Sequence, residues 1–323
     1  MRILVTGASG FIGRALVEDL AAQGHRVRAA MRQPADIFSR AVEVVAVSDL
    51  ARPLEWRSLL SDINAVVHLA GIAHITSGIA EDLYDRVNRA ATAALATAAA
   101  RDRIERLIFV SSIRAQSGPA CDHPLTETDA PHPVDAYGRS KLAAEDAIRA
   151  AQLPFTILRP ALIYGPGVKG NLADLVRLAR SPWPLPFGAL RNRRSLLARS
   201  NLVAAIHRAL VAPAMLNETY VVADPEPLTM VDIVAALRAG LGRGPRLIPV
   251  PPSLLALSLR ATGRAHLWDR IGGNCIVDPA KLLAAGWRPL TDTPAGLAAT
   301  AQAARPPKSW VNCCVGLGSA GRY

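Results

Sequence analysis

Three glycines with the spacing GxxGxxG stand between the first apolar run of the chain and its first helical pattern. Residues 3–6 read Ile-Leu-Val-Thr and lead into Gly7, with Gly10 and Gly13 following at three-residue intervals. After a strand, such glycines let backbone N–H groups at a helix N-terminus approach a pyrophosphate. The spacing differs from the general GxGxxG fingerprint, but its position predicts a strand, a phosphate-binding turn and a helix.

Short apolar runs then alternate with alanine-rich helical patterns through the first half of the chain. The expected strands cover residues 3–6, 26–31, 42–47, 65–69, 107–111 and 155–159, and the expected helices cover residues 13–23, 80–101 and 137–151. Strands that are apolar throughout and separated by helices are typical of a parallel sheet covered on both faces. We therefore predict an α/β fold with a doubly wound parallel sheet of the Rossmann type.

The pattern changes after residue 165, where turn clusters and a proline-rich stretch interrupt it. We predict a dinucleotide-binding domain over residues 1–165 and a smaller C-terminal α+β lid over 166–304 that binds substrate. Within the lid, residues 218–222 form one more strand that returns to the first sheet. Residues 228–241 form a helix with Thr229 as its cap. Residues 305–323 lack either periodicity and are expected to be a disordered tail.

The chain is basic, with 37 Lys and Arg against 26 Asp and Glu and a net charge of +11. This excess favours anionic partners, but the positive residues are scattered, so we do not expect nucleic acid as the main partner. The four cysteines form no CxxC pair, and no metal site is expected. No apolar run reaches the roughly 18 residues of a membrane span, and the chain opens on a strand rather than a signal peptide. We expect a cytoplasmic protein.

The end of the second expected strand favours NADP over NAD. NAD-binding sites place an Asp or Glu there to accept the ribose 2′-hydroxyl, whereas this chain has Arg32. Arginine pairs with a 2′-phosphate, which a carboxylate would repel. Asp49 and Leu50, after the third strand, are candidates for the adenine edge, although an Asp there can also serve as a helix cap.

Tyr137 and Lys141 stand four residues apart on one face of an expected helix. A tyrosine can pass a proton to a carbonyl only if its anion is stabilised, because its ordinary pKa is about 10. A lysine one turn away stabilises that anion and can also hold a nicotinamide ribose. Ser112, at the end of the strand over 107–111, can hydrogen-bond the same substrate oxygen.

These motifs resemble those of the extended short-chain dehydrogenases/reductases, in the NAD-dependent epimerase/dehydratase family. Further matches are residues 68–71, Asn88, and residues 159–160 ahead of residues 164–167. The resemblance implies that Tyr137 is the general acid/base, that Lys141 lowers its pKa and that Ser112 binds the substrate oxygen. The cofactor, NADP or NAD, would then contact Gly7, Gly10, Phe11, Ile12, Gly13, Leu69, Ala70, Gly71, Tyr137, Lys141 and Pro160.

The same resemblance implies a UDP-sugar substrate and a homodimer. Asn171 falls where the family holds a nucleotide diphosphate, and Arg194 falls where an arginine commonly contacts that diphosphate. Arg270 is a further candidate for that contact. Arginine is the natural bidentate partner of phosphate oxygens.

Three functions stay open at this point. Arg32 and the missing acid favour a reductase that draws on exchangeable NADPH. Residues 109–114 and 192–196 resemble a subgroup of the family that reduces the 4-keto group of a UDP-4-keto-6-deoxy-hexosamine, and this resemblance implies that substrate. The alternative is a UDP-glucose or UDP-N-acetylglucosamine 4-epimerase, which keeps tightly bound NAD. A non-catalytic NADP-binding regulator or assembly protein is the third, although such proteins usually lose the tyrosine and lysine. A 4,6-dehydratase is disfavoured because no Asp-Glu pair adjoins Ser112.

Overall fold

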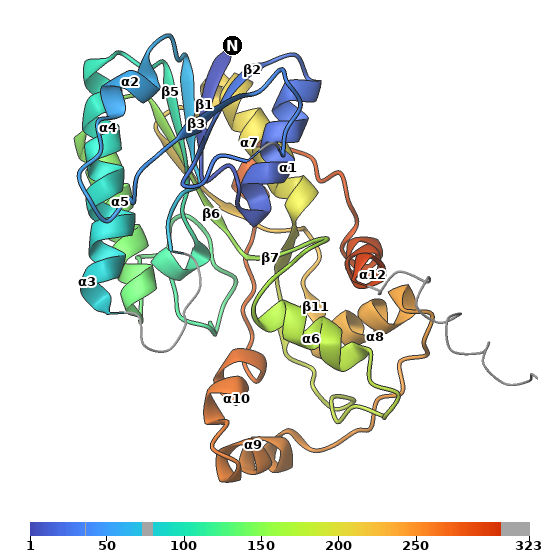
Figure 1. The fold of residues 1–323 in the computed structure, drawn as a ribbon. Coiled ribbons are helices and arrows are strands. Elements are labelled where there is room, and N and C mark those ends of the chain that lie inside the picture. The colour runs from blue at the N-terminus through green and yellow to red at the C-terminus, as the bar shows by residue number, and fades with distance from the viewer. Residues whose placement is uncertain (36, 73–79, 305–323) are drawn as a thin grey trace, which may run out of the picture.

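A computed structural model of the chain describes residues 1–35, 37–72 and 80–304 (Figure 1). The side chains of His266, Asp269 and Arg270 lie outside that description. The tail predicted over residues 305–323 also lies outside the described residues.

Seven parallel strands form the central sheet, in the order β10-β6-β5-β4-β1-β2-β3. They are β1 (Arg2–Thr6), β2 (Arg26–Met31), β3 (Glu43–Ala46), β4 (Ala65–His68), β5 (Arg106–Val110), β6 (Phe155–Pro160) and β10 (Glu218–Val222). The order reverses beside β1, so the chain winds first to one edge of the sheet and then to the other, and ligands of such sheets bind at that switch point. The predicted doubly wound parallel sheet is confirmed, including the late strand β10, which pairs with β6.

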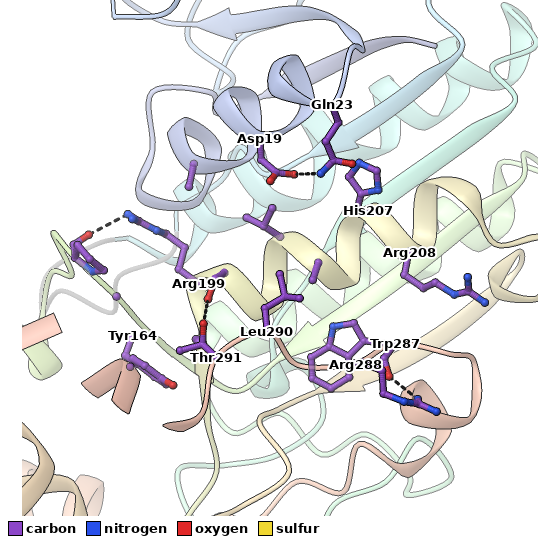
Figure 2. Close-up of a pocket in the computed structure, with 18 of the residues that line it drawn as sticks. Asp19, Gln23, Tyr164, Arg199, His207, Arg208, Trp287, Arg288, Leu290 and Thr291 are labelled. Carbon is purple, nitrogen blue, oxygen red and sulfur yellow. Dashed lines mark hydrogen bonds between the residues drawn. The ribbon is translucent and has the colours of Figure 1, made fainter. Parts of the chain in front are cut away.

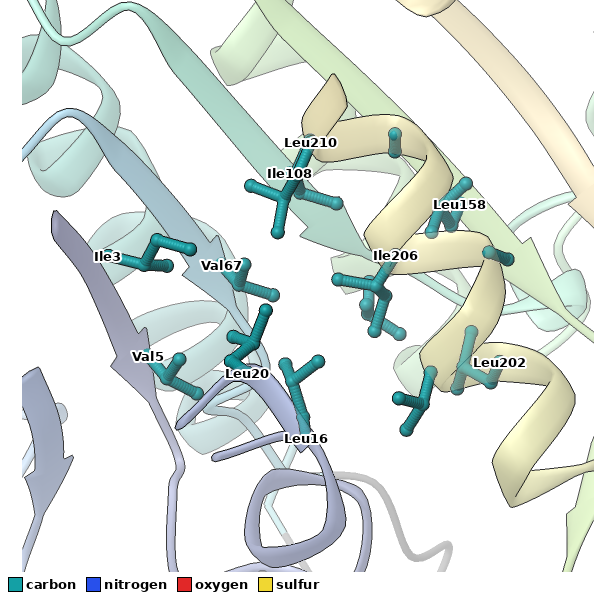
Figure 3. Packing of buried hydrophobic residues seen from close by; sticks show 14 of the residues in the cluster. Ile3, Val5, Leu16, Leu20, Val67, Ile108, Leu158, Leu202, Ile206 and Leu210 are labelled. Atoms are coloured by element: carbon teal, nitrogen blue, oxygen red, sulfur yellow. The ribbon is translucent and has the colours of Figure 1, made fainter. Parts of the chain in front are cut away.

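Helices cover both faces of this sheet (Figure 1). On one face, α1 (Phe11–Ala22) and α7 (Arg199–Val211) pack on the strands, and on the other lie α2 (Trp56–Leu60), α4 (Ala91–Arg101) and α5 (Ala136–Ala150). Figure 3 shows the first of these interfaces. Strand residues Ile3, Val5, Val67, Ile108 and Leu158 meet Leu16, Leu20, Leu202, Ile206 and Leu210. The helical residues recur every four positions, which places them on one face, and each buried side chain contributes about 1.5–3 kcal/mol.

The helix expected over residues 80–101 is interrupted. The structure has α3 (Glu81–Tyr84), a π-helical turn η1 (Asp85–Ala90) and then α4. A π turn inserts one residue into the helical repeat and is often found at functional sites. Here it carries the buried side chain of Asn88.

The C-terminal part consists of short elements with cores of their own. The strands β7 (Leu162–Tyr164) and β9 (Leu196–Ala198) pair, as do β8 (Arg193–Arg194) and β11 (Leu228–Thr229). The remaining elements are η2 (Ile113–Ala115), α6 (Asn171–Ala179), η3 (Pro213–Met215), α8 (Met230–Gly240), α9 (Pro252–Ala261), α10 (Ala265–Ile271), α11 (Ala280–Ala284) and α12 (Thr293–Ala303).

The start predicted for the helix over residues 228–241 is wrong by two residues. Leu228 and Thr229 pair with β8 instead, and α8 begins at Met230. The expected cap is confirmed, because the Thr229 side chain accepts a hydrogen bond from the backbone N–H of Asp232 in a capping box. None of the helices in the described part of the chain has the length and apolar character needed to cross a bilayer.

Candidate active site

The glycine turn is shaped by the backbone packed around it. Gly7 has φ +69°, and a Cβ there would lie 2.9 Å from the backbone nitrogen of Ala70. A Cβ on Gly13 would lie 2.2 Å from the carbonyl oxygen of Gly7, so neither position tolerates a side chain. The first turn of α1 has no acidic residue, and its N-cap, Gly10, provides no side-chain cap. The N–H groups there are suited to an anion, so the turn fits the pyrophosphate of a dinucleotide.

A second loop, after β4, adjoins this turn. The predicted cofactor-lining residues Leu69 and Ala70 lie against Gly7. Asn88 holds the end of the loop, since its Oδ1 accepts from the N–H of Ile72 at 2.9 Å. A Cβ on Gly71 would lie 2.8 Å from the same oxygen. The π turn therefore positions the loop through Asn88.

His68, just before this loop, is buried and uncharged. Its Nδ1 lies 2.7 Å from the hydroxyl of Thr6, and its Nε2 lies 3.0 Å from the hydroxyl of Thr92. Burial lowers the pKa of His68 to about 3, and the positive charge of Lys141 acts in the same direction. His68 therefore ties β1 and β4 to the helix α4 as a neutral ring.

The end of β2 lies beside the glycine turn, because the N–H of Ala8 donates to the carbonyl of Ala30 at 3.3 Å. Arg32 follows two residues later and is exposed. Asp49 is also exposed, and its Oδ1 accepts from the N–H of Ala51 at 3.0 Å. In the described structure Asp49 stabilises a local turn, next to the half-buried Leu50.

The end of β5 and the start of α5 bring Ser112 and Tyr137 together. Asp135 caps α5, because its Oδ1 accepts from the N–H of Gly138 at 2.7 Å, and it forms an ion pair with Arg114. A Cβ on Gly138 would lie 2.2 Å from the carbonyl oxygen of Arg114. Only glycine allows α5 to pack so closely on the turn that follows Ser112, and this contact sets the spacing of the two hydroxyl groups.

The buried Tyr137 hydroxyl stays protonated over the physiological range. Burial raises the pKa of Tyr137 to about 12, the hydrogen bond with Ser112 acts in the opposite direction, and the negative charge of Asp135 raises it further. In the described structure burial outweighs any lowering of this pKa by Lys141, whose ammonium donates to the carbonyl of Val110 at 2.8 Å.

Lys141 is itself strongly perturbed. It is 5% exposed, and its Nζ lies 4.2 Å from the ring centroid of Phe109. Burial lowers the pKa of Lys141 to about 7, while the carboxylate of Glu145, one helical turn later, acts to raise it. The lysine can therefore gain or lose a proton near neutral pH, which suits a proton-transfer site.

A buried ion pair behind these residues was missed at the sequence level. Glu145 is 0% exposed and Arg159 is 3% exposed, and Arg159 Nη2 donates to Glu145 Oε2 at 2.6 Å. The Ser111 hydroxyl donates to the other carboxylate oxygen at 2.6 Å, and Arg159 Nη1 donates to Gln116 at 2.8 Å. The network ties α5 to β6 and to the residue before Ser112. Two sequence features could have indicated this ion pair: a Glu one helical turn after Lys141, and an Arg within a largely apolar strand.

The predicted substrate residues lie in the C-terminal part and beside it. Arg194 is half-buried on β8, and its two Nη atoms donate to the carbonyls of Gly273 and Pro119, each at 3.0 Å. Asn171 is the exposed first residue of α6, and Arg270 lies on α10 with a side chain outside the described part. Pro160 ends β6 beside β5.

A pocket of about 620 Å³ lies elsewhere, between α1, α7 and the segment that runs from α11 to α12 (Figure 2). Its lining includes Asp19, Arg199, His207 and Trp287. None of the predicted catalytic residues lines it, because they sit on or beside α5, which packs on the opposite face of the sheet.

Known proteins resemble this chain in sequence and in fold. Residues 3–223 match the family model described as the NAD dependent epimerase/dehydratase family. The chain is 32% identical to a UDP-glucose 4-epimerase of Vibrio cholerae, covering 93% of this chain and 94% of that protein. It is 31% identical to a ceramide reductase of Caulobacter vibrioides, covering 89% and 86%. Among solved structures, UDP-glucuronic acid 4-epimerase of Bacillus cereus in complex with NAD has a TM-score of 0.76, with 20% identity and coverage of 94% of this chain and 96% of that one.

Proposed function

Because the chain belongs to the NAD dependent epimerase/dehydratase family, we propose that it is an NAD(P)-dependent oxidoreductase acting at C4 of a UDP-hexose or UDP-hexosamine. The observation that carries this proposal is the cluster of Ser112, which follows β5, with Tyr137 and Lys141 of α5, in the same parallel sheet whose first strand leads into the glycine turn. A hydride-transfer enzyme needs an acid next to the reacting carbonyl and a phosphate-binding turn within one dinucleotide length of it.

In this proposal the chain's own residues handle the proton, and a bound nicotinamide supplies or accepts the hydride. Tyr137 donates its proton to the C4 oxygen during reduction and takes it back during oxidation. Ser112 hydrogen-bonds the same oxygen. Lys141 stabilises the tyrosinate that forms and, with its pKa near 7, can pass a proton onward. Burial excludes water from the reacting groups and strengthens these interactions.

Reduction of a UDP-4-keto-6-deoxy-hexosamine is the direction we favour. Arg32 stands exposed just after β2, beside the glycine turn, and its side chain is available to a 2′-phosphate. NADPH is the usual donor for biosynthetic reductions that release their cofactor in every cycle. A 4-epimerase is the second candidate, and the 32% identity to the Vibrio cholerae enzyme supports it.

The nucleotide that co-purifies with the protein distinguishes the reductase from the 4-epimerase. Protein purified without added nucleotide is denatured, and any nucleotide is identified by chromatography. Little bound cofactor, with NADPH bound more tightly than NADH, supports the reductase, and Arg32→Ala should then weaken NADPH binding about tenfold without affecting NADH. Stoichiometric NAD would reject the reductase in favour of the epimerase.

Replacement of Tyr137 by Phe tests whether the chain is an enzyme rather than a cofactor-binding regulator. Loss of the proton donor should lower kcat about 10²–10⁴-fold while cofactor binding persists. Tyr220→Phe is the matched control, because Tyr220 is equally buried but lies on β10. A Tyr137→Phe protein with unchanged turnover would contradict the assignment.

The finer parts of the substrate site remain predictions. We propose that Arg194, Asn171 and Arg270 contact the diphosphate of the UDP-sugar, in which case Arg194→Gln should raise KM for the nucleotide sugar more than for the cofactor. We also propose the division into a cofactor-binding part over residues 1–165 and a substrate-binding part over 166–304. A homodimer and a cytoplasmic location complete the proposal.

A further inference from the structure

The helix α9 packs on the protein through one side and exposes two leucines on the other. Leu255 is buried in a cluster with Leu185 and Phe187, and Ala256 beside it is also buried. On the outer side, Leu254 is 57% exposed and Leu257 is 63% exposed. Large apolar side chains that lie exposed together on one helix indicate a surface that a partner covers.

Neighbouring elements extend this apolar surface. Ile248, just before α9, is 48% exposed, and its N–H donates to the carbonyl of Leu185 at 2.9 Å. Two residues before Leu185, Trp183 is 74% exposed. These segments lie at the end of the molecule far from the central sheet (Figure 1). We call Trp183, Ile248, Leu254 and Leu257, with the exposed arginines around them, the α9 edge.

The charged residues that flank and lie on α9 in the sequence, between Asp232 and Asp269, are all basic. Between Asp232 and Asp269 the sequence contains no Asp or Glu, whereas it contains five arginines. One of them, Arg238, is buried and bonds to backbone carbonyls. The others are exposed: Arg243, Arg246, Arg260 and Arg264. Arg260 lies on α9 itself, one helical turn after the exposed Leu257.

We infer that the α9 edge docks peripherally on an anionic lipid surface. Exposed leucines, a tryptophan and flanking arginines without acids are the combination that inserts at a headgroup boundary, where apolar side chains enter the acyl region and guanidinium groups meet phosphates. A second copy of the chain would place arginines against arginines. The segment over residues 305–323 also carries only basic charged residues, Arg305, Lys308 and Arg322, so its charge does not complement the edge.

Sedimentation with lipid vesicles tests this inference on the full-length protein. The wild type should bind vesicles of equimolar phosphatidylglycerol and phosphatidylcholine at least about tenfold more tightly than vesicles of phosphatidylcholine alone. Most of this preference should disappear at about 1 M salt, where the Debye length falls to about 3 Å. Failure of the wild type to bind the anionic vesicles would overturn the inference.

Two double variants separate the apolar from the electrostatic part. Leu254→Gln with Leu257→Gln should weaken binding about tenfold or more at any salt concentration, because insertion is lost. Arg260→Gln with Arg264→Gln should weaken it about tenfold at about 0.1 M salt and little at about 1 M.

Val211→Gln with Leu290→Gln is the matched control, because both of these side chains are exposed and both line the pocket between α1 and α7, away from α9. All substituted side chains are exposed, so urea unfolding should confirm that each variant remains folded. Unchanged vesicle binding in the leucine variant would reduce the edge to a general polyanion site and overturn the lipid assignment. A changed oligomeric state in that variant, measured by light scattering, would assign the surface to a second copy instead.

Discussion

Replacing the buried Lys141 by Met should make the protein more stable at neutral pH and less stable at alkaline pH. Burial lowers the pKa of Lys141 from 10.5 to about 7, so the two values differ by about 3.5 pH units. At about 1.4 kcal/mol per pH unit, charging this amine in the folded state costs about 5 kcal/mol relative to the unfolded chain. Between pH 7 and 10.5 the unfolded state binds more protons, so wild-type stability rises with pH over that window. Below pH 7 the amine is charged in both the folded and the unfolded state, so the full cost of about 5 kcal/mol destabilises the folded protein.

Methionine has a similar volume and no charge, so the variant avoids this cost at neutral pH. It loses the hydrogen bond to the Val110 carbonyl and the packing contact with the Phe109 ring, which for the neutral amine are together worth about 1–2 kcal/mol. The net effect is a gain of about 3–4 kcal/mol at pH 6–7, which becomes a loss of about 1 kcal/mol or less near pH 10.

Urea unfolding of both proteins at intervals from pH 6 to pH 10 measures this difference. Titration of every other group is shared by the two chains and cancels in the comparison. Lys169→Met, at an exposed position, is the control, and its effect on the free energy of unfolding should be small and independent of pH. An equally constant difference for Lys141→Met would refute the reasoning, because it would mean that the buried amine has no perturbed pKa.

Other consequences follow from the same site. Gly138→Ala should destabilise the fold by about 1–3 kcal/mol in urea unfolding, because the new Cβ would lie 2.2 Å from a carbonyl oxygen of η2. Glu145→Gln should cost about 3–5 kcal/mol by the same measurement, since it leaves the buried Arg159 guanidinium without an anionic partner; a loss below 1 kcal/mol would contradict the burial of this pair. In steady-state kinetics, kcat/KM for reduction should fall above pH about 7 as Lys141 loses its proton, with no further loss from Tyr137 below pH 10, because its pKa is raised to about 12. Lys141→Arg should move that fall to higher pH, and a fall that stays in place would assign it to another group.

The central sheet was predictable because apolar residues dominate most of its strands. Strands of a parallel sheet are covered by helices on both sides and therefore appear in the sequence as short apolar runs. Such runs can be recognised without knowing which strands pair with one another. Every observed end of β1 to β6 lies within one residue of the expected one. The return of β10 to the sheet was also predicted, as one apolar run in an otherwise broken region.

The π turn and the start of α8 were not predictable from local patterns. The turn η1 has an ordinary helical sequence, and its extra residue accompanies contacts of Asn88 with Ile72 and Ser140, the latter 52 residues away. Similarly, Leu228 and Thr229 are compatible with a helix, but their pairing with β8 makes them a strand. In both cases tertiary contacts outweigh a weak local propensity.

The sequence by itself determined the glycine turn, the order of strands and helices, and the placement of Tyr137 and Lys141 on one helix face, because these follow from conformational preferences within a few residues. Only the tertiary structure decided the ionisation of the site. Lys141 loses water because Val110 and Phe109 of β5 pack around it, and Glu145 finds its partner in Arg159 on β6. A pKa depends on the solvent and charges that surround a group in three dimensions, and the linear sequence does not contain those surroundings.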